Sequence, residues 1–348
     1  MENTFSWPPS GQGRRVPTLR KISSIVGGVV PALIIAVLMY AAFFVKPSVH
    51  SVGMNRPVIE QRDLFYSVAM PAGETVWAVG NYGKIVISED NGATWTRQPS
   101  GVDAHLQSIA AWDSNRAVAV GNDLTALYTN DGGKHWIKAK VEAKKNQNVN
   151  ELVRVRVLAG GHAVAVGEFG TVLGSDDFGA SWRALPVVGD ASWNDAALLS
   201  PQTYLIVGEI GRIEMTSDGG ATWTQTPSPT KSTLNSVFFR DARNGLAAGT
   251  GGVVISTDDG GATWTQLPRI TQQHIFDVMW DGHHWVLTGD KGVLLFGSAD
   301  TKTWNDMSRL AGSSWHTQTT ARNGVYALAG RGGIAIAKLG EDNKKSGE

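Results

Sequence analysis

Cysteine is absent from the 348-residue chain. This absence excludes disulfides, thiolate metal ligands, a cysteine nucleophile and a lipid-modified N-terminal cysteine. An excess of charge of one sign is also lacking, because 31 basic side chains balance 31 acidic ones. No stripe of basic residues is interleaved with stacking aromatics, so the sequence does not have the electrostatic pattern of a nucleic-acid-binding protein.

One long apolar run is present, at residues 22–45, and it carries no charge over 24 positions. As a helix it would be about 36 Å long, enough to cross a hydrocarbon core of about 30 Å. Arg14, Arg15, Arg20 and Lys21 precede it. Under the positive-inside rule, this predicts a cytoplasmic N-terminal segment at residues 1–21 and a single transmembrane helix at residues 22–45.

The rest of the chain is then expected in the periplasm, held at the inner membrane through a linker at residues 46–53. A cleaved signal peptide is the alternative, but the run is longer than a normal signal core and no small-x-small cleavage site follows it. The polar ends, residues 1–21 and 340–348, have the composition of disordered segments.

A short motif recurs along the chain after this segment, first as "SEDNGATW" at Ser88–Trp95. Successive copies are 41, 46, 41, 41 and 41 residues apart, measured between their aspartates. The aspartates are Asp90, Asp131, Asp177, Asp218, Asp259 and Asp300, and the tryptophans are Trp95, Trp136, Trp182, Trp223, Trp264 and Trp304. Short apolar runs follow the same period and end at Gly80, Gly121, Gly167, Gly208, Gly249, Gly289 and Gly330. A constant period of this length is typical of repeat architectures.

Each unit contains four short extended runs separated by turn residues, and helical periodicity is absent outside the apolar segment. Four strands in about 41 residues are typical of a propeller blade. The sequence therefore predicts an all-β fold, a seven-bladed β-propeller over residues 54–339, with the turn glycines at positive φ. The seventh unit, Ser314–Leu339, has three strands and no motif. Met54–Arg62 is expected to supply its closing strand, because an open sheet edge promotes aggregation.

The motif Ser/Thr-x-Asp-x-Gly-x-Thr/Ser-Trp is the Asp box, also called the bacterial neuraminidase repeat. Its carboxylate and hydroxyls can bind backbone N–H groups of their own turn, and its Trp can fill space between neighbouring sheets. Six equivalent copies around a ring cannot form one active site. The box is therefore predicted to be structural.

A membrane-tethered, sialidase-like glycosidase is the alternative from a different functional class. Such enzymes need two facing carboxylates, or a Tyr nucleophile with an acid and three arginines. The sialidase Arg-Ile-Pro motif is absent, and the one visible insertion is short, near Val141–Asn150. His283 and His284 are adjacent and would point to opposite faces, so they make a poor metal site. A non-catalytic protein without cofactor, metal or small-molecule ligand is expected.

Polar and charged side chains are predicted to converge at one mouth of the ring. The turn between the second and third strands of a blade is expected on the same face as the start of the first strand. The candidate partner-binding residues in these positions are Arg154, Arg156, Glu168, Asp195, Glu209, Arg240, Asp277, Asp290 and Arg331. The simpler alternative is that turns are polar because they contact water.

The chain resembles the photosystem II stability/assembly-factor family of plants and cyanobacteria over residues of about 60–338. The resemblance is carried by "VGNYGKIVISEDNGATW" (Val79–Trp95) and "GTGGVVISTDDGGATW" (Gly249–Trp264). It implies a non-enzymatic factor that holds a membrane-protein subunit through an arginine-bearing patch. The nearest candidates for that patch are Arg154, Arg156 and Arg240.

The N-terminus departs from the photosynthetic members, which carry a transit peptide or a lipidated cysteine. Members in non-photosynthetic bacteria resemble accessory proteins of resistance-nodulation-division transporters that move hydrophobic substrates or lipids. The resemblance therefore implies an assembly or accessory subunit of an inner-membrane complex. Such a transporter is the first expectation for the partner, and a photosystem is the alternative.

Overall fold

The computed structural model describes residues 29–40, 57–143, 151–187, 189–312 and 314–338. The chain divides into two units, Met1–Arg56 and Pro57–Glu348. Residues 29–40 of the first unit form a helix with exposed apolar side chains. Among the residues described, no helix has both the length and the apolar character needed to cross a membrane. The expected transmembrane helix is described over residues 29–40 alone. Residues 1–21, the linker 46–53 and the tail 340–348 lie outside the described residues.

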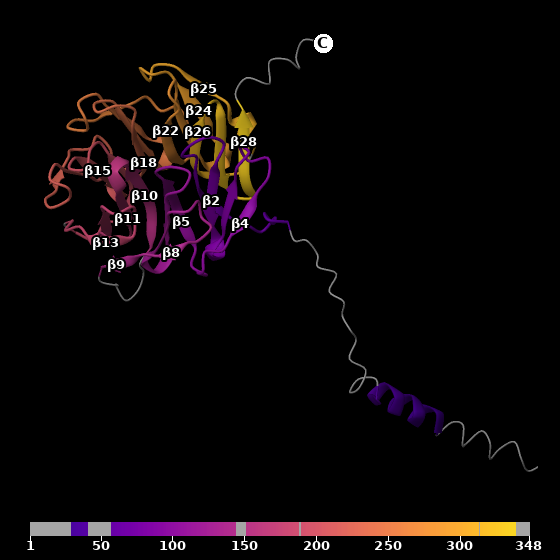
Figure 1. The fold of residues 1–348 in the computed structure, drawn as a ribbon. Coiled ribbons are helices and arrows are strands. Elements are labelled where there is room, and N and C mark those ends of the chain that lie inside the picture. The colour runs from indigo at the N-terminus through magenta and orange to yellow at the C-terminus, as the bar shows by residue number, and fades with distance from the viewer. Residues whose placement is uncertain (1–28, 41–56, 144–150, 188, 313, 339–348) are drawn as a thin grey trace, which may run out of the picture. The chain divides into compact units, whose positions relative to one another are not determined.

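The second unit is a seven-bladed β-propeller, as the repeat predicts (Figure 1). Blade 1 consists of β1 (Phe65–Ala69), β2 (Val76–Gly80), β3 (Ile85–Ser88) and β4 (Thr96–Gln98), and blade 2 of β5 (Leu106–Ala111), β6 (Ala117–Gly121), β7 (Thr125–Thr129) and β8 (Ile137–Lys138). Blade 3 contains β10 (Leu152–Leu158), β11 (His162–Gly167), β12 (Val172–Ser175), β13 (Ser181–Ala184) and an added strand, β9 (Lys140–Glu142).

Blade 4 consists of β14 (Trp193–Leu198), β15 (Tyr204–Gly208), β16 (Ile213–Thr216) and β17 (Thr224–Gln225), and blade 5 of β18 (Leu234–Phe239), β19 (Gly245–Gly249), β20 (Val254–Thr257) and β21 (Thr265–Gln266). Blade 6 has β22 (Ile275–Trp280), β23 (Trp285–Gly289), β24 (Leu294–Gly297) and β25 (Trp304–Asp306), and blade 7 has β26 (His316–Arg322), β27 (Val325–Gly330) and β28 (Gly333–Lys338). The short helices are η1 (Asn81–Gly83), η2 (Asn122–Leu124), η3 (Ala159–Gly161), η4 (Glu209–Gly211), η5 (Thr250–Gly252), η6 (Asp290–Gly292) and α2 (Ser308–Ala311).

The second strand of a blade is apolar at nearly every position because neighbouring sheets cover both of its faces. In β2, "VWAVG", and β15, "YLIVG", every residue is buried. A strand with two covered faces reads as a continuous apolar run, without the alternation of a half-exposed strand. The same glycine-ended runs that set the period in the sequence thus form the interior of each blade.

The glycine that ends each second strand is required by a close backbone approach. Gly208 and Gly249 have extended backbones, with φ of −165° and −170°. A Cβ atom at the seven equivalent glycines would lie 1.9–2.1 Å from the carbonyl oxygen that precedes the first strand of the same blade. The expectation of positive φ is therefore wrong for these glycines. It is correct for the second turn glycines, for example Gly83 and Gly211 with φ of 62° and 69°.

The Asp boxes have the local hydrogen bonding that their residue types predict. In blade 1, Asp90 accepts hydrogen bonds from the Thr94 N–H (2.8 Å) and the Thr94 hydroxyl (2.6 Å). The Ser88 hydroxyl donates to Asp90 (2.7 Å) and accepts from the Gly92 N–H (2.7 Å). The same pattern recurs around Asp131, Asp177, Asp218 and Asp259. In blade 6, where the box is one residue shorter, Asp300 accepts from the Lys302 N–H instead (3.2 Å).

Each box tryptophan packs into the apolar cluster between its own blade and the preceding one. Trp182 of blade 3 is buried against Val118 and Val120 of blade 2, and Trp264 of blade 5 packs with Leu205 of blade 4. Trp136, Trp223, Trp304 and Trp95 occupy the corresponding clusters of the other blade pairs. The box thus has a structural role, as its sequence predicts: its tryptophan packs between neighbouring sheets.

Because of the box carboxylates, the stability of the ring is expected to decrease at acidic pH. Hydrogen bonds from the hydroxyls of Thr94, Thr222 and Thr263 hold the pKa values of Asp90, Asp218 and Asp259 at about 2. Because these pKa values lie below those of the unfolded chain, the stabilisation is complete above about pH 4 and is lost as the pH falls toward 2.

We expect the melting temperature, followed by circular dichroism, to fall steeply between pH 4 and pH 2. Asp259→Asn should be less stable than wild type at pH 7, and the difference should shrink as the pH approaches 2. A melting temperature that is flat across this interval would contradict the assignment.

The ring closes without the expected strand from Met54–Arg62. Residues 57–62 contain a bend and a turn but no strand, and residues 54–56 lie outside the described part of the chain. Two local features keep this segment out of a sheet: Pro57 has no N–H to donate, and the Glu60 N–H donates to the Asp63 carboxylate (2.7 Å). Blade 7 has three strands among the described residues.

Side-chain packing closes the ring instead. Val58 and Ile59 contact the apolar cluster that blades 1 and 7 share, and Trp95 and Ile336 pack into the same cluster. Leu64 forms an isolated bridge with Arg331, and a buried ion pair joins Lys84 to Asp63. The first and last blades lie side by side in consequence (Figure 1).

The one insertion seen in the sequence extends a sheet. Its first residues belong to β9, which pairs in parallel with β13 and so covers the outer edge of blade 3. Residues 144–150 lie outside the described part.

Candidate functional site

Two faces of the ring can be distinguished by the direction of the first strands. We call the end at which these strands begin the upper face. The N–H after each glycine-ended strand donates to the carbonyl that precedes the first strand, as in Glu168 to Glu151 (3.1 Å) and Glu209 to Ser192 (3.2 Å). The turn between the second and third strands of each blade therefore lies on the upper face, as predicted. The other end is called the lower face.

A β-bulge recurs at the second residue of the first strand in all seven blades, where the pairing register shifts. A bulge re-aims the side chain of the unpaired residue. Here these side chains line a depression of about 200 Å³ together with Arg154. They are Tyr66, Gln107, Val153, Asn194, Asn235, Phe276 and Thr317. Each blade contributes one bulge residue, and blade 3 adds Arg154, so the depression is the upper mouth of the central channel.

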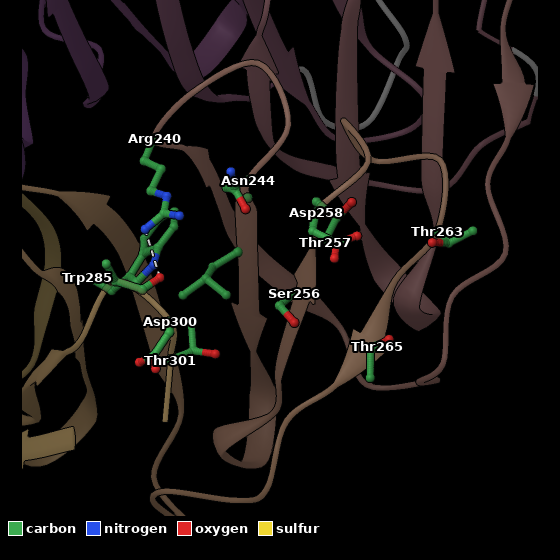
Figure 2. A pocket seen from close by; sticks show the side chains of 13 residues that line it. Arg240, Asn244, Ser256, Thr257, Asp258, Thr263, Thr265, Trp285, Asp300 and Thr301 are labelled. Atoms are coloured by element: carbon green, nitrogen blue, oxygen red, sulfur yellow. Dashed lines mark hydrogen bonds between the residues drawn. The ribbon is translucent and has the colours of Figure 1, made fainter. Parts of the chain in front are cut away.

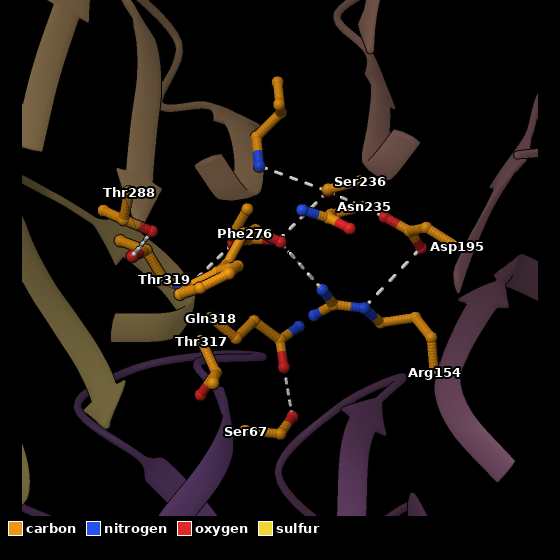
Figure 3. A network of polar contacts seen from close by, with 12 residues as sticks. Ser67, Arg154, Asp195, Asn235, Ser236, Phe276, Thr288, Thr317, Gln318 and Thr319 are labelled. Atoms are coloured by element: carbon orange, nitrogen blue, oxygen red, sulfur yellow. Dashed lines mark hydrogen bonds and ion pairs between the residues drawn. The ribbon is translucent and has the colours of Figure 1, made fainter. Parts of the chain in front are cut away.

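The next residue of each first strand belongs to a polar layer inside the ring. These residues are Ser67, Ser108, Arg154, Asp195, Ser236, Asp277 and Gln318, and each is at most 8% exposed. Figure 3 shows Ser67, Arg154, Asp195, Ser236 and Gln318 converging across the channel. Ser67 donates to Gln318, and the Ser236 hydroxyl contacts both Asp195 (2.8 Å) and Asp277 (3.2 Å).

Two arginines and two aspartates form the centre of this layer. Arg156 binds Asp195 through two hydrogen bonds, from Nε (2.8 Å) and Nη2 (2.6 Å). Arg154 lies 3.5 Å from Asp277 and 3.8 Å from Asp195. The formal charges cancel, and the bidentate geometry is the strong form of an arginine–carboxylate contact.

The two aspartates differ in proton affinity. Burial by itself would raise the pKa of Asp195, but the charges of Arg156 and Arg154 hold that pKa below its usual value. Burial raises the pKa of Asp277 above its usual value, and the two arginines offset only part of this effect. As the pH falls, Asp277 therefore takes up a proton before Asp195 does.

Most of the residues that line the lower mouth are apolar. A depression of about 340 Å³ is lined there by Arg156, Phe238, Met279, Trp280 and neighbouring residues. The polar layer separates this depression from the upper one. The side chains of this layer are buried, and Arg154 of blade 3 reaches the Phe276 carbonyl of blade 6 (3.4 Å), so the layer blocks the channel between the two depressions.

The nine predicted partner-binding residues do not share one mouth. Glu168, Glu209, Asp290 and Arg331 lie in the turns of the upper face. Arg154 borders the upper depression and Arg156 the lower one. Asp195 and Asp277 are 0% and 2% exposed, so they serve the internal network and present no surface to a partner.

Arg240 lies at the lower end of blade 5. It follows the end of β18, stacks over the Trp280 ring at 5.3 Å and donates to the Ala299 carbonyl (2.8 Å). It lines a pocket of about 370 Å³ between blades 5 and 6, together with Asp258, Trp285 and Asp300 (Figure 2). The expected patch of Arg154, Arg156 and Arg240 is therefore divided between the two mouths. Arg154 borders the upper depression, whereas Arg156 lines the lower one and Arg240 stacks on Trp280, which lines the same lower depression.

Three apolar residues of the upper face are absent from the predicted set. Tyr82, Phe169 and Ile210 stand at the tips of their turns and are 69%, 50% and 70% exposed. Aligning the units would have shown the signal, since "NYG", "EFG" and "EIG" each place a large apolar residue directly before a turn glycine.

Within the described residues, no group of three or more histidine, aspartate or glutamate side chains is arranged to hold a metal ion. His283 and His284 lie in an exposed turn, where their N–H groups bind Asp281 at 2.7 and 2.6 Å.

Comparison with known proteins places the chain among related propellers. The family described as photosynthesis system II assembly factor YCF48 matches residues 101–226 and 180–273. A search of curated protein sequences finds no match.

Several solved structures share the fold. A YCF48 bound to D1 peptide is 18% identical with a TM-score of 0.67, covering 81% of this chain and 94% of that one. YCF48 from Cyanidioschyzon merolae is 16% identical with a TM-score of 0.64, over 80% and 96% of the two chains. The WD40 propeller domain of Doa1 is 11% identical with a TM-score of 0.68, over 81% and 95%. At these identities, the structures support the fold alone.

Proposed function

Because this chain belongs to the photosystem II assembly-factor-like family of Asp-box propellers, we propose that it is a non-catalytic assembly or accessory subunit of a membrane-protein complex. The observation that carries the proposal is the blocked channel between two open depressions. A ring of this kind offers two rigid faces for a partner and no path through its centre. A propeller of the same fold binds a peptide, which supports the same role.

The chemistry of the channel supports a non-catalytic role. A glycosidase needs two carboxylates that face a sugar. Here the two channel carboxylates, Asp195 and Asp277, are buried and ion-paired with arginines. Among the described residues that line the two depressions there is no carboxylate. A substrate at either mouth would meet amides, hydroxyls, aromatic rings and an arginine.

The finer proposal places the propeller in the periplasm, tethered to the inner membrane, with a resistance-nodulation-division transporter as the partner. It rests on the apolar run at residues 22–45, the basic residues before it and the family resemblance. A photosystem is the alternative partner.

Affinity purification of the tagged full-length chain from its native membrane in mild detergent tests this proposal. We expect an integral membrane protein to co-purify in stoichiometric amount and to be absent from an untagged control. A multi-span transporter would support the finer proposal, whereas photosystem subunits would replace it with the alternative. A chain that purifies alone and releases sugars from a glycan panel would contradict the non-catalytic role.

A further inference from the structure

We propose that the upper face of blades 1 to 4 is a docking surface for a basic peptide segment with large apolar side chains. The surface, which we call the acidic–apolar sector, consists of Tyr82, Glu151, Glu168, Phe169, Glu209 and Ile210. The inference rests on the proposed partner-binding function and assigns the chemistry of the partner.

The apolar members of the sector occupy one equivalent position in their blades. Three of the four exposed large apolar side chains in the described part of the propeller are Tyr82, Phe169 and Ile210. Isolated exposed apolar residues are common, but repeated use of one turn position on one face forms a patch. A patch of this kind marks an interaction site.

Folding does not explain why these residues are large. Tyr82, Phe169 and Ile210 have φ of 52°, 50° and 55°, a conformation that bulky and β-branched residues avoid. Blades 5 and 7 place Gly251 and Gly332 at the same position, with φ of 67° and 90°. Glycine therefore suits the turn. Phe169 and Ile210 bring backbone strain and exposed apolar surface, and Tyr82 does the same while making one edge contact with the His105 ring.

Carboxylates surround the apolar tips. Glu209 accepts a hydrogen bond from the Ser192 N–H (3.1 Å), and Glu151 accepts one from Gln107. The Oε2 atom of Glu168 is buried without a hydrogen-bond partner. None of the ion pairs among the described residues involves these three glutamates.

The three glutamates also repel one another. Burial raises the pKa of Glu168, and the charges of Glu151 and Glu209 raise it further. An incoming lysine or arginine would pair with these groups and relieve the repulsion, which is the complementarity expected at a charged interface.

The sector is continuous from blade 1 to blade 3. The Tyr82 ring makes an edge contact with His105 at 5.1 Å, and His105 stacks with Tyr66 at 6.3 Å. Gln107 then bridges to Glu151 of blade 3. The equivalent turns of blades 5 to 7 carry no apolar tip. They include Lys291 and Arg331 as well as Asp290, so they lack the excess of carboxylates found in blades 3 and 4. A basic segment is therefore directed to blades 1 to 4, and the carboxylates disfavour an anionic membrane surface as the occupant.

Binding of labelled 15-residue peptides to the full-length chain in detergent, measured by fluorescence anisotropy, tests the sector. A peptide of lysine and leucine is expected to bind at least about tenfold more tightly than one of glutamate and leucine or one of lysine and serine. The double variants Phe169→Gly/Ile210→Gly and Glu168→Gln/Glu209→Gln should each weaken binding at least about fivefold. The glycine variants preserve the turn, since glycine is already present in blades 5 and 7.

Lys291→Gly is the matched control, because it changes the equivalent position outside the sector and should leave binding unchanged. Equal binding of the glutamate and leucine peptide, or unchanged binding by both double variants, would overturn the proposal. Tighter binding to phosphatidylglycerol vesicles than to the lysine and leucine peptide would also overturn it, in favour of a membrane-contacting surface.

Co-purification separates this proposal from the proposed function. If Phe169→Gly/Ile210→Gly retains the partner that wild type retains, the function stands and the sector is refuted. If wild type binds the lysine and leucine peptide through the sector but no membrane protein co-purifies, the sector stands and the proposed function fails.

Discussion

Replacing Gly249 by alanine is expected to destabilise the propeller by about 3 kcal/mol or more, the upper part of the range for overpacking. The added Cβ would lie 1.9 Å from the Thr233 carbonyl oxygen and 2.9 Å from Leu234 Cα. Both are backbone atoms, so no side chain can move aside to make room. The same carbonyl accepts the Thr250 N–H (3.0 Å), and separating the two segments would break this bond. Thermal unfolding followed by circular dichroism measures the effect.

Gly251→Ala is the matched control, two residues away in the same turn. Gly251 has φ of 67° but no atom within 4 Å of an added Cβ. Its substitution should therefore bring only the left-handed backbone penalty, about 1–2 kcal/mol. If Gly251→Ala lowered the melting temperature more than Gly249→Ala, positive φ and not close approach would be the stronger reason for glycine in these turns.

Replacing Asp195 by alanine is expected to cost about 3–5 kcal/mol of unfolding free energy, because it leaves a buried charge without its partner. Arg156 would lose both of its hydrogen bonds, and the backbone N–H of Val237 would lose its acceptor at 3.0 Å. Arg154 and Arg156 would remain 3.5 and 3.8 Å from Asp277, so two arginines would share one aspartate. Urea unfolding at pH 7 gives the free-energy difference.

The double variant Asp195→Leu/Arg156→Met tests whether the unpaired charge of Arg156 causes the destabilisation by Asp195→Ala. It removes an arginine and its aspartate together and leaves Arg154 with Asp277, so it should be more stable than Asp195→Ala. If the unfolding free energy of Asp195→Ala lay within about 1 kcal/mol of the wild-type value, the network would not stabilise the ring.

Much of the fold could be predicted because the relevant interactions are local or periodic. The distance between successive box aspartates defines the blades, and the box hydrogen bonds span four residues or fewer in most copies, as from Asp90 to Thr94. Side chains so close in sequence meet wherever the turn forms. The absence of cysteine and of a basic stripe likewise limits the chemistry open to the chain.

The predictions from sequence that proved wrong concern segments that are far apart in the chain and meet in the folded ring. Arg156 and Asp195 are 39 residues apart, and their pairing turned predicted surface charges into an internal network. The predicted closing strand is not found at residues 57–62, because the side chains of Val58 and Ile59 pack on blades 1 and 7 while their backbone joins no sheet. The close contact of Gly249 with the Thr233 carbonyl also depends on how strands pair, which no single turn reveals.

The number of blades, the structural role of the Asp box and the face that carries the second-to-third-strand turns could all be predicted from the amino-acid order. These features follow from periodicity and from hydrogen bonds within short segments. The blocked channel, the division of Arg154, Arg156 and Arg240 between the two mouths, and the surface shared by acidic and apolar residues of blades 1 to 4 became apparent in the folded ring alone. The reason is geometric: ring closure brings one position from every blade to a common centre, and what those side chains do depends on all seven together.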